Sequence, residues 1–304
     1  MMRLCIFSPS GVTLKAAPVR LALRRLKALG FDAYLDDDAL RRYQRFAGDD
    51  DTRLQALHRV ADQAPAVALA SRGGYGLTRL LDRIDWPRLQ RSVEAGTRWV
   101  GLSDITALQL GLLAHGGAPS WAGPTAAEDF GRSDEAGGLD ELTVPCFTEA
   151  MRGELEAVGF RTEAGFDGLD VAGRLWGGNL TVLLSLLGTP HWPRVRGGIL
   201  FLEDVNEQPY RVERMLLQLH QAGVLAAQKA VLLGQFTVQT KSPLDRGFSL
   251  KVAVQRLRSE CATPILTGLP FGHVPAKLTL PVGRRVQLVA DGRNAYLHWG
   301  HAGG

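Results

Sequence analysis

Cysteine is scarce in this sequence. The 304 residues include three cysteines, Cys5, Cys146 and Cys261, which lie far apart and form no C-x-x-C pair. A small, odd and scattered set argues against a disulfide framework and against a zinc site built from cysteines. We therefore expect three buried, reduced thiols.

Long hydrophobic runs are also missing. The segment "LTVLLSLLG", residues 180–188, is among the longest, and a membrane-spanning helix needs about 20 apolar residues. The first residues, "MMRLCIFSPSG", carry one arginine and a short β-like run. They have neither the long apolar region nor the small-residue cleavage site of a secretory signal. We interpret them as the first strand of a cytoplasmic protein that does not associate with membranes.

No segment is strongly basic, although the formal net charge is +4. Most basic residues are arginines interleaved with acids, as in "LDRIDWPRLQR" and "DVNEQPYRVERM". This mixture is typical of a solvated surface and does not favour a nucleic-acid partner.

The histidines form no metal-binding motif. His58 and His220 lie in helical patterns, and His298 and His301 lie near the C-terminus, without an H-E-x-x-H or comparable spacing. We expect no metal and no organic cofactor.

Strand and helix patterns alternate through the first half of the chain. Apolar runs predict strands at 4–11, 31–36, 66–71 and 98–103, and amphipathic patterns predict helices at 18–30, 49–63, 76–84 and 104–117. This order predicts an α/β fold with an N-terminal doubly wound, Rossmann-like parallel sheet.

The second half has more β character. Strands are predicted at 173–178, 198–204, 230–236, 284–292 and 295–300, with helices at 179–188 and 209–223. Between the halves, glycine-rich and acidic sequence suggests a connection. We predict an N-terminal α/β domain over 1–140, a connection over 141–170 and a smaller β-rich domain over 171–304.

Ser103 lies between a predicted strand and a predicted helix, in "RWVGLSDITALQLGLLAHGG". Serine is a favoured N-cap residue, so its plainest role is to cap the helix. The alternative is a nucleophile exposed at a tight turn, with the following amides positioned for an oxyanion. The G-x-S-x-G elbow is half matched, because Gly101 is present and Ile105 replaces the second glycine.

The segment "SRGGYG", residues 71–76, is called here the glycine turn; it follows another predicted strand. It is not a phosphate loop, because G-x-x-x-x-G-K-[ST] is absent and Arg79 breaks G-x-G-x-x-G. Its glycines either form a plain turn or supply a second oxyanion donor. Because the carboxyl ends of parallel strands form the ligand-binding edge, both this turn and Ser103 are expected there.

A serine nucleophile needs a base and an orienting acid. His273 lies in "LPFGHVPAKLTLPVG", a rigid loop between β-like segments. A buried strand, 199–202, runs into Glu203 and Asp204, with Glu207 a little further on. Each of these acids could orient the imidazole, while Asp204 or Glu207 could instead cap the helix that opens near residue 209.

Taken together, these segments resemble the LD-carboxypeptidase family of serine peptidases. The matching pieces occur in the order "SPSG" (8–11), "FAGDD" (46–50), "SRGGYGLTRLLDRID" (71–85), "GLSDITALQLGLL" (101–113), "GP" (123–124), "GGNL" (177–180), "FLEDVNEQPYRVERML" (201–216), "LGQF" (233–236) and "FGHVPAKLTLPVG" (271–283). Each piece is weak alone, but the ordered set covers nearly the whole chain and is specific.

The resemblance implies a triad of Ser103 as nucleophile, His273 as general base and acid, and Glu203 as orienting carboxylate. It also implies an oxyanion hole formed by the N–H of Asp104 with an amide of the Arg72-Gly73-Gly74 turn. The active site would then lie between the two domains. The family resemblance further implies a homodimer.

The implied activity is release of the C-terminal D-alanine from murein tetrapeptides during cell-wall recycling, with Arg72 and Tyr75 as candidate substrate contacts. One alternative is a peptidase similar to the microcin C self-immunity proteins, which act on aminoacyl-nucleotide analogues. That role would favour an aromatic platform for a base, for which Trp121 and Trp176 are candidates. A second alternative is a non-catalytic binding protein with the same fold.

Overall fold

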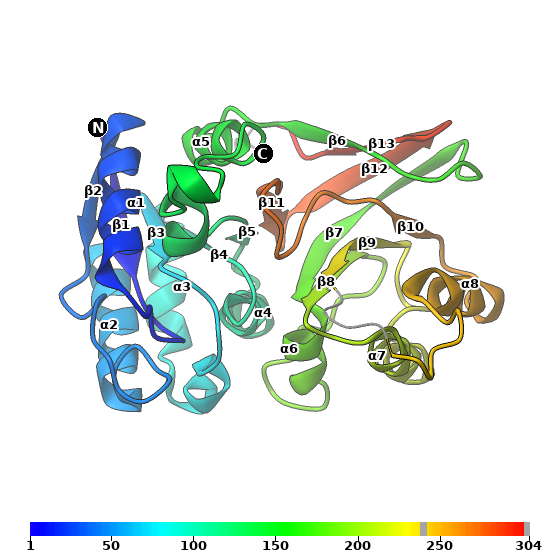
Figure 1. Ribbon diagram of the computed structural model, residues 1–304, viewed down its shortest axis with the longest axis horizontal. Coiled ribbons are helices and arrows are strands. Elements are labelled where there is room, and N and C mark those ends of the chain that lie inside the picture. Colours follow the sequence, from blue (N-terminus) through cyan, green and yellow to red (C-terminus); the bar gives the residue numbers. More distant parts are fainter. Residues whose placement is uncertain (238–241, 301–304) are drawn as a thin grey trace. The chain divides into compact units, whose positions relative to one another are not determined.

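The computed structural model describes residues 1–237 and 242–300, so that His301 lies outside the described residues. The chain divides into two compact units, which are described separately (Figure 1). Unit 1 comprises Met1–Leu155, Gly188–Pro193 and Pro275–Gly283, and unit 2 comprises Glu156–Leu187, Arg194–Val274 and Arg284–Gly304.

Unit 1 is built on a sheet with the strand order β11-β5-β4-β3-β1-β2 (Figure 1). Its strands are β1 (Met2–Phe7), β2 (Phe31–Leu35), β3 (Val67–Ala70), β4 (Arg98–Gly101), β5 (Ser120–Ala122) and β11 (Leu280–Val282). Strands β1 to β5 are parallel, and β11 is an antiparallel edge strand. The order 2-1-3-4-5 is that of a doubly wound sheet, so the predicted fold class of this half is confirmed.

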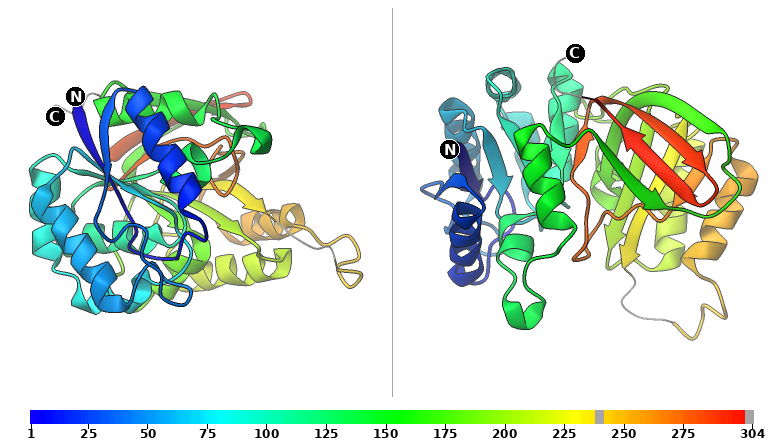
Figure 2. Two further views of the ribbon diagram at one scale, coloured as in Figure 1. Left: turned by 60° about the vertical axis from the view of Figure 1, so that its left-hand side comes forward. Right: turned by 90° about the horizontal axis from the view of Figure 1, so that it is seen from above.

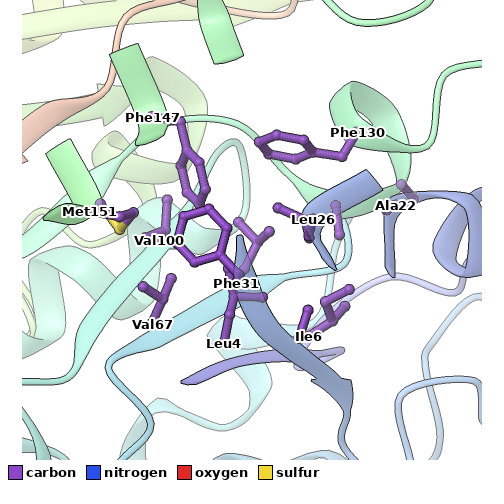
Figure 3. Close-up of a cluster of buried hydrophobic side chains, with 14 of the residues drawn as sticks. Leu4, Ile6, Ala22, Leu26, Phe31, Val67, Val100, Phe130, Phe147 and Met151 are labelled. Atoms are coloured by element: carbon purple, nitrogen blue, oxygen red, sulfur yellow. The ribbon is translucent and has the colours of Figure 1, made fainter. Parts of the chain in front are cut away.

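Helices cover both faces of this sheet. They are α1 (Ala16–Ala28), α2 (Asp50–Gln63), α3 (Trp86–Glu94), α4 (Ile105–Gly116) and α5 (Thr143–Arg152), with shorter turns η1 (Leu77–Arg79), η2 (Leu81–Arg83), η3 (Ala126–Phe130) and η4 (Asp134–Ala136). On one face, Leu4 and Val67 of the sheet lie in a cluster with Leu26 of α1 and Phe147 of α5 (Figure 3). On the other, the Trp99 indole donates to Ser92 of α3.

Unit 2 contains a mixed sheet with the strand order β10-β9-β8-β7-β12-β13-β6. Its strands are labelled in Figure 1 and are seen from above on the right of Figure 2. Its strands are β6 (Ala157–Arg161), β7 (Leu169–Asn179), β8 (Ile199–Val205), β9 (Ala230–Thr237), β10 (Ile265–Thr267), β12 (Arg285–Asp291) and β13 (Asn294–His298); its helices are α6 (Leu180–Ser185), α7 (Pro209–Gln221) and α8 (Leu250–Glu260). Strands β7 to β10 are parallel, whereas β7, β12, β13 and β6 pair antiparallel in that order. The predicted β-rich second half is confirmed.

Two of the predicted segments differ from the structure, and helices α3 and α8 were not predicted. The helix predicted over 76–84 is instead a pair of tight 3₁₀ turns, η1 and η2. Leu77 and Leu80 are buried, and the amide of Leu80 donates to the carbonyl of Leu77. The apolar spacing that predicted an α-helix therefore also fits the tighter i→i+3 bonding of a 3₁₀ turn. The expected connection, 141–170, contains α5 and β6, while the domain boundaries at 140 and 170 remain a prediction.

Cys5, Cys146 and Cys261 are free and buried, as predicted. Burial raises the pKa of the Cys5 thiol to about 12 and that of Cys146 to about 11. Among the helices of the described residues, none has both the length and the apolar character needed to cross a membrane.

Candidate active site

Ser103 lies in the turn that joins β4 to α4. Its φ is +66°, a left-handed conformation that is uncommon for residues other than glycine and is often found at strained functional turns. Gly101 permits the turn, because a Cβ at this position would lie 2.7 Å from Cγ1 of Ile105. The N-cap residue of α4 is Asp104. The alternative in which Ser103 caps this helix therefore does not fit the turn.

The glycine turn lies directly against Ser103. A Cβ added to Gly73 would lie 2.5 Å from Cβ and 3.0 Å from Oγ of Ser103, and Gly74 has a φ of +101°. Within the part of the chain that the structure describes, the amides of Gly73, Gly74 and Asp104 donate no hydrogen bond. Unengaged amides beside a hydroxyl can bind the oxyanion of an acyl-transfer intermediate.

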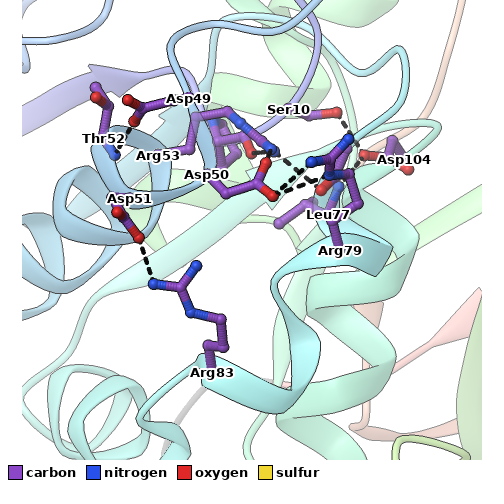
Figure 4. A network of polar contacts seen from close by, with 12 residues as sticks. Ser10, Asp49, Asp50, Asp51, Thr52, Arg53, Leu77, Arg79, Arg83 and Asp104 are labelled. Carbon is purple, nitrogen blue, oxygen red and sulfur yellow. Dashed lines mark hydrogen bonds and ion pairs between the residues drawn. The ribbon is translucent and has the colours of Figure 1, made fainter.

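The Asp104 side chain connects this turn to the loop after β1. Its Oδ2 accepts hydrogen bonds from Oγ of Ser10 and from the amide of Leu77, the latter at 2.8 Å (Figure 4). The side chain is buried, and this burial raises the pKa of Asp104 while the two donors oppose the rise. Gly11 completes the connection, since its amide donates to the carbonyl of Gly73 at 3.0 Å.

The two candidate substrate contacts have different surroundings. Arg72 is partly engaged, because its Nη1 donates to the carbonyl of Val12 at 2.9 Å and its Nε lies 3.5 Å from Oε1 of Glu128. Tyr75 is 44% exposed, and the guanidinium of Arg45 lies over its ring. Tyr75 therefore presents an aromatic surface near the turn, whereas Trp121 and Trp176 are buried.

In unit 2, Glu203 and His273 form a hydrogen-bonded pair. Glu203 lies near the end of β8 and is fully buried, and its Oε2 lies 2.8 Å from Nδ1 of His273. The His273 side chain is 18% exposed. A buried carboxylate on Nδ1 fixes the imidazole orientation and stabilises the imidazolium, which suits a general base.

The structure distinguishes the three acids that the sequence left open. Asp204 accepts hydrogen bonds from the amide and hydroxyl of Thr181, at 2.9 and 2.7 Å, and so supports the start of α6. Glu207 is paired with Arg211, with Nε and Oε2 2.7 Å apart. The alternative in which Asp204 or Glu207 caps α7 does not occur, because the N-cap residue is Gln208. Of the three, Glu203 contacts the imidazole.

Backbone irregularities bring the Glu203–His273 pair together. The ladder between β8 and β9 shifts register beside Glu203, as β-bulges near functional sites commonly do. In the loop that carries His273, Gly272 has a φ of +140°, and a Cβ there would lie 3.2 Å from Oε2 of Glu203. The amide of Gln235 donates to the carbonyl of Phe271 at 2.8 Å and fixes this loop to β9.

Asn179 is the contact that sequence reasoning missed. Its Oδ1 accepts a hydrogen bond from the amide of Val182, so Asn179 is the N-cap of α6. Its Nδ2 also donates to Oε1 of Glu203 at 3.1 Å and to Oδ1 of Asp204 at 2.9 Å. The N-cap pattern hid this second role, because Glu203 becomes its neighbour through the pairing of β7 with β8.

A serine hydrolase is defined by a small set of groups. They are a serine at a strained strand–helix turn, unengaged amides and a carboxylate–imidazole pair. The model of the LD-carboxypeptidase N-terminal domain matches residues 4–123, and that of the LD-carboxypeptidase C-terminal domain matches residues 172–288. The chain belongs to the LD-carboxypeptidase family and is a serine carboxypeptidase.

Known proteins are similar over nearly the whole length. The murein tetrapeptide carboxypeptidase of Pseudomonas aeruginosa is 33% identical over an alignment of 281 residues, with 88% of this chain and 86% of the relative covered. The crystal structure of muramoyltetrapeptide carboxypeptidase from Oxalobacter formigenes has a TM-score of 0.90 and 39% identity, covering 98% of this chain and 99% of that one.

A more distant structure shares the fold. The microcin C7 self-immunity protein in complex with aspartyl sulfamoyl adenosine has a TM-score of 0.84 and 21% identity. The two chains are covered to 98% and 96%, respectively. At this identity the likeness shows the fold alone.

Proposed function

We propose that this protein is a cytoplasmic LD-carboxypeptidase of murein recycling, which removes the C-terminal D-alanine from tetrapeptides. The scissile amide would join the L-centre of a diamino acid to D-alanine. The observation that carries the proposal is the similarity to the muramoyltetrapeptide carboxypeptidase structure, at 39% identity over 98% of this chain. The buried Glu203–His273 pair and the Ser103 turn supply groups that suit this hydrolysis.

In the proposed mechanism, Ser103 Oγ attacks the amide carbonyl while His273 accepts its proton. Amides of Asp104 and of Gly73 or Gly74 donate to the oxyanion, and Glu203 stabilises the imidazolium. His273 then gives the proton to the nitrogen of the departing D-alanine as the C–N bond breaks. Water, deprotonated by His273, hydrolyses the acyl-enzyme and restores Ser103. No step requires a metal or an organic cofactor.

Substrate binding adds two further proposals. The terminal carboxylate of D-alanine needs a cation or amide donors nearby, and Arg72 is the proposed cation, with Tyr75 lining the pocket. Because Glu128 already lies beside Arg72, the guanidinium would bind the carboxylate through its remaining donors.

Mass spectrometry of a murein tetrapeptide incubated with the wild-type protein and with Ser103→Ala tests the reaction. We expect the wild type to release one alanine and the variant to release none. An intact tetrapeptide in the wild-type reaction would overturn the murein assignment. Release by both proteins would overturn the role of Ser103.

An aminoacyl sulfamoyl adenosine, tested in parallel, separates the alternative substrate class. Cleavage of this compound but not of the tetrapeptide would place the protein with the self-immunity peptidases. The proposed homodimer is tested by light scattering after size exclusion, where a monomer mass would contradict it.

A further inference from the structure

Arg53 is a buried charge that the proposed mechanism does not use. It lies in α2, where the other buried residues are Ala56, Leu57, Val60 and Ala61. The side chain of Arg53 is fully buried. A buried arginine is rare unless its charge and donors are engaged, because removing the guanidinium from water is costly.

Its guanidinium joins two loops. Nη1 donates to the carbonyl of Pro9 at 3.1 Å and to the carbonyl of Gly76 at 2.9 Å, and Nη2 forms an ion pair with Asp50 (Figure 4). The Phe46 ring packs against it, with Cζ 4.8 Å from the ring centroid. The chain leaves space for this contact, since a Cβ at Gly76 would lie 2.6 Å from Nη1.

Asp104 engages the adjacent residues of the same two loops. Arg53 binds the carbonyls of residues 9 and 76, whereas Asp104 accepts from the Ser10 hydroxyl and the Leu77 amide. The loop after β1 and the end of the glycine turn are thus fixed through both acceptors and donors. The positive charge of Arg53 also favours the ionised form of Asp104 and lowers the pKa of this carboxyl, against the larger effect of burial.

The fixed loops determine where the amides of Gly73 and Gly74 lie. Gly73 and Gly74 lie between the fixed residue Gly76 and the strand end at Ala70, and Gly73 is in contact with Ser103. An oxyanion donor must be held within a fraction of an ångström of its working position. We propose that Arg53 is a positioning residue that holds the glycine turn, and with it the amides of Gly73 and Gly74, against Ser103.

This inference rests on the proposed function, and its first test is steady-state hydrolysis of the murein tetrapeptide by Arg53→Met. The thioether side chain preserves much of the apolar packing and removes all donors. We expect kcat to fall roughly 100-fold, the loss typical of a displaced oxyanion donor, with KM changed less than about threefold. Arg53→Lys retains the charge and some donors, and we expect it to recover part of kcat.

Arg83→Met is the matched control. Arg83 forms an ion pair with Asp51 of α2, and its side chain is 48% exposed. Among the described residues it forms no hydrogen bond or ion pair with either loop. Its kcat should stay within about twofold of the wild type. The inference would be overturned if the folded Arg53→Met enzyme has the wild-type kcat, whether or not its KM is raised.

A second measurement distinguishes this inference from the proposed substrate. Diisopropyl fluorophosphate modifies an activated serine, and intact-mass spectrometry follows the rate at which it modifies Ser103. This reaction depends on the oxyanion site but needs no murein peptide. Slower modification in Arg53→Met than in Arg83→Met supports the positioning role even when tetrapeptide is not cleaved. Equal rates would overturn it. If Arg53→Met shows no cooperative thermal transition, the same comparison is made with Arg53→Lys.

Discussion

The two units present their chemical groups by different means. In unit 1 the essential geometry is that of the backbone: Ser103 has a left-handed φ of +66°, and Gly73 contacts it because it lacks a Cβ. In unit 2 the geometry depends on side chains. There Glu203 is held between Asn179 and His273 by two hydrogen bonds.

This contrast matches the tasks proposed for each half. An oxyanion is stabilised by backbone N–H groups that need exact placement, and glycine allows the chain to approach closely. A proton acceptor needs a tautomer and an orientation, which a buried carboxylate sets. Substitutions in unit 1 should therefore act through steric displacement, and those in unit 2 through the identity of donors and acceptors.

The largest effect is expected from Glu203→Gln, which changes donors without changing shape. Asn179 Nδ2 donates to Oε1, so the oxygen of the new amide will face Asn179 and its NH₂ will face His273. Nδ1 must then accept, which leaves the proton on Nε2 and removes the base. We expect kcat for the tetrapeptide to fall roughly 10⁴-fold, as for other triads with the wrong tautomer.

Asp204→Asn is the control for this change, because Asp204 supports the start of α6 through Thr181 and does not contact the imidazole. It should lower the melting temperature while kcat stays within about threefold. Equal kcat losses in the two variants would mean that Glu203 has no special role as partner of His273.

The next largest effect is expected from Gly73→Ala, the steric counterpart in unit 1. The added Cβ would lie 2.5 Å from Cβ of Ser103 and 2.9 Å from the carbonyl of Leu102, so the turn must move. We expect kcat to fall roughly 10²- to 10³-fold, as when one oxyanion donor is lost.

Gly96→Ala is the control that distinguishes backbone strain from a steric collision with Ser103. Gly96 has a φ of +103°, but a Cβ there would meet no atom within 4 Å. It should cost about 1 kcal/mol of stability and leave kcat unchanged. Full activity of Gly73→Ala would show that the turn tolerates displacement. It would contradict the expectation that substitutions in unit 1 act through steric displacement.

A smaller effect is expected from Asn179→Ser, which keeps a capping oxygen but removes the donor to Glu203. Loss of a hydrogen bond to a charged group is worth about 1.5–3 kcal/mol, so we expect kcat to fall at least roughly 10-fold. The control is Thr181→Ala, which removes a hydroxyl that donates to Asp204 and to Sδ of Met215 but not to Glu203, and it should affect thermal stability only. If both variants retain wild-type kcat, the Asn179 contact is structural.

The sequence predicted the alternation of strands and helices well, because apolar periodicity is a local property. It placed Ser103 and the glycine turn after neighbouring parallel strands, β4 and β3, where the structure has them. The choice of Glu203 over Asp204 depended on the family resemblance. Local pattern alone could not decide which of two adjacent carboxylates meets a histidine about 70 residues further along the chain.

Contacts between distant segments explain what the sequence did not reveal. Arg53 and Gly76 are 23 positions apart, and a Cβ at Gly76 would collide with the Arg53 guanidinium and the Phe46 ring. Residues 275–283 follow His273 but belong to unit 1, where Lys277 forms a buried ion pair with Asp129. Periodicity has no signal for such pairs.

The smallest expected effect concerns the stability of unit 2. It tests whether side-chain polar contacts other than the Glu203–His273 pair stabilise this unit. Burial alone would raise the pKa of Glu163, but hydrogen bonds from Thr267 and Arg258 outweigh it and lower the pKa from 4.5 to about 2. The unfolded chain therefore binds more protons between these values, and the stabilisation is complete above about pH 4.5 and is lost as pH falls toward 2. Because the Glu163 side chain is 35% exposed, screening reduces the contribution to about 1–2 kcal/mol.

Urea unfolding of the wild type and Glu163→Gln at several pH values measures this effect. We expect the variant to be less stable at pH 6 and the difference to shrink steadily below pH 4.5. Glu94→Gln serves as the control, since Glu94 accepts a hydrogen bond from Gln90 and, in the described residues, has no cationic partner. If the difference in unfolding free energy between wild type and Glu163→Gln stays constant from pH 6 to pH 3, the charge of Glu163 does not stabilise unit 2. Dependence on donor and acceptor identity would then be limited to the Glu203–His273 pair.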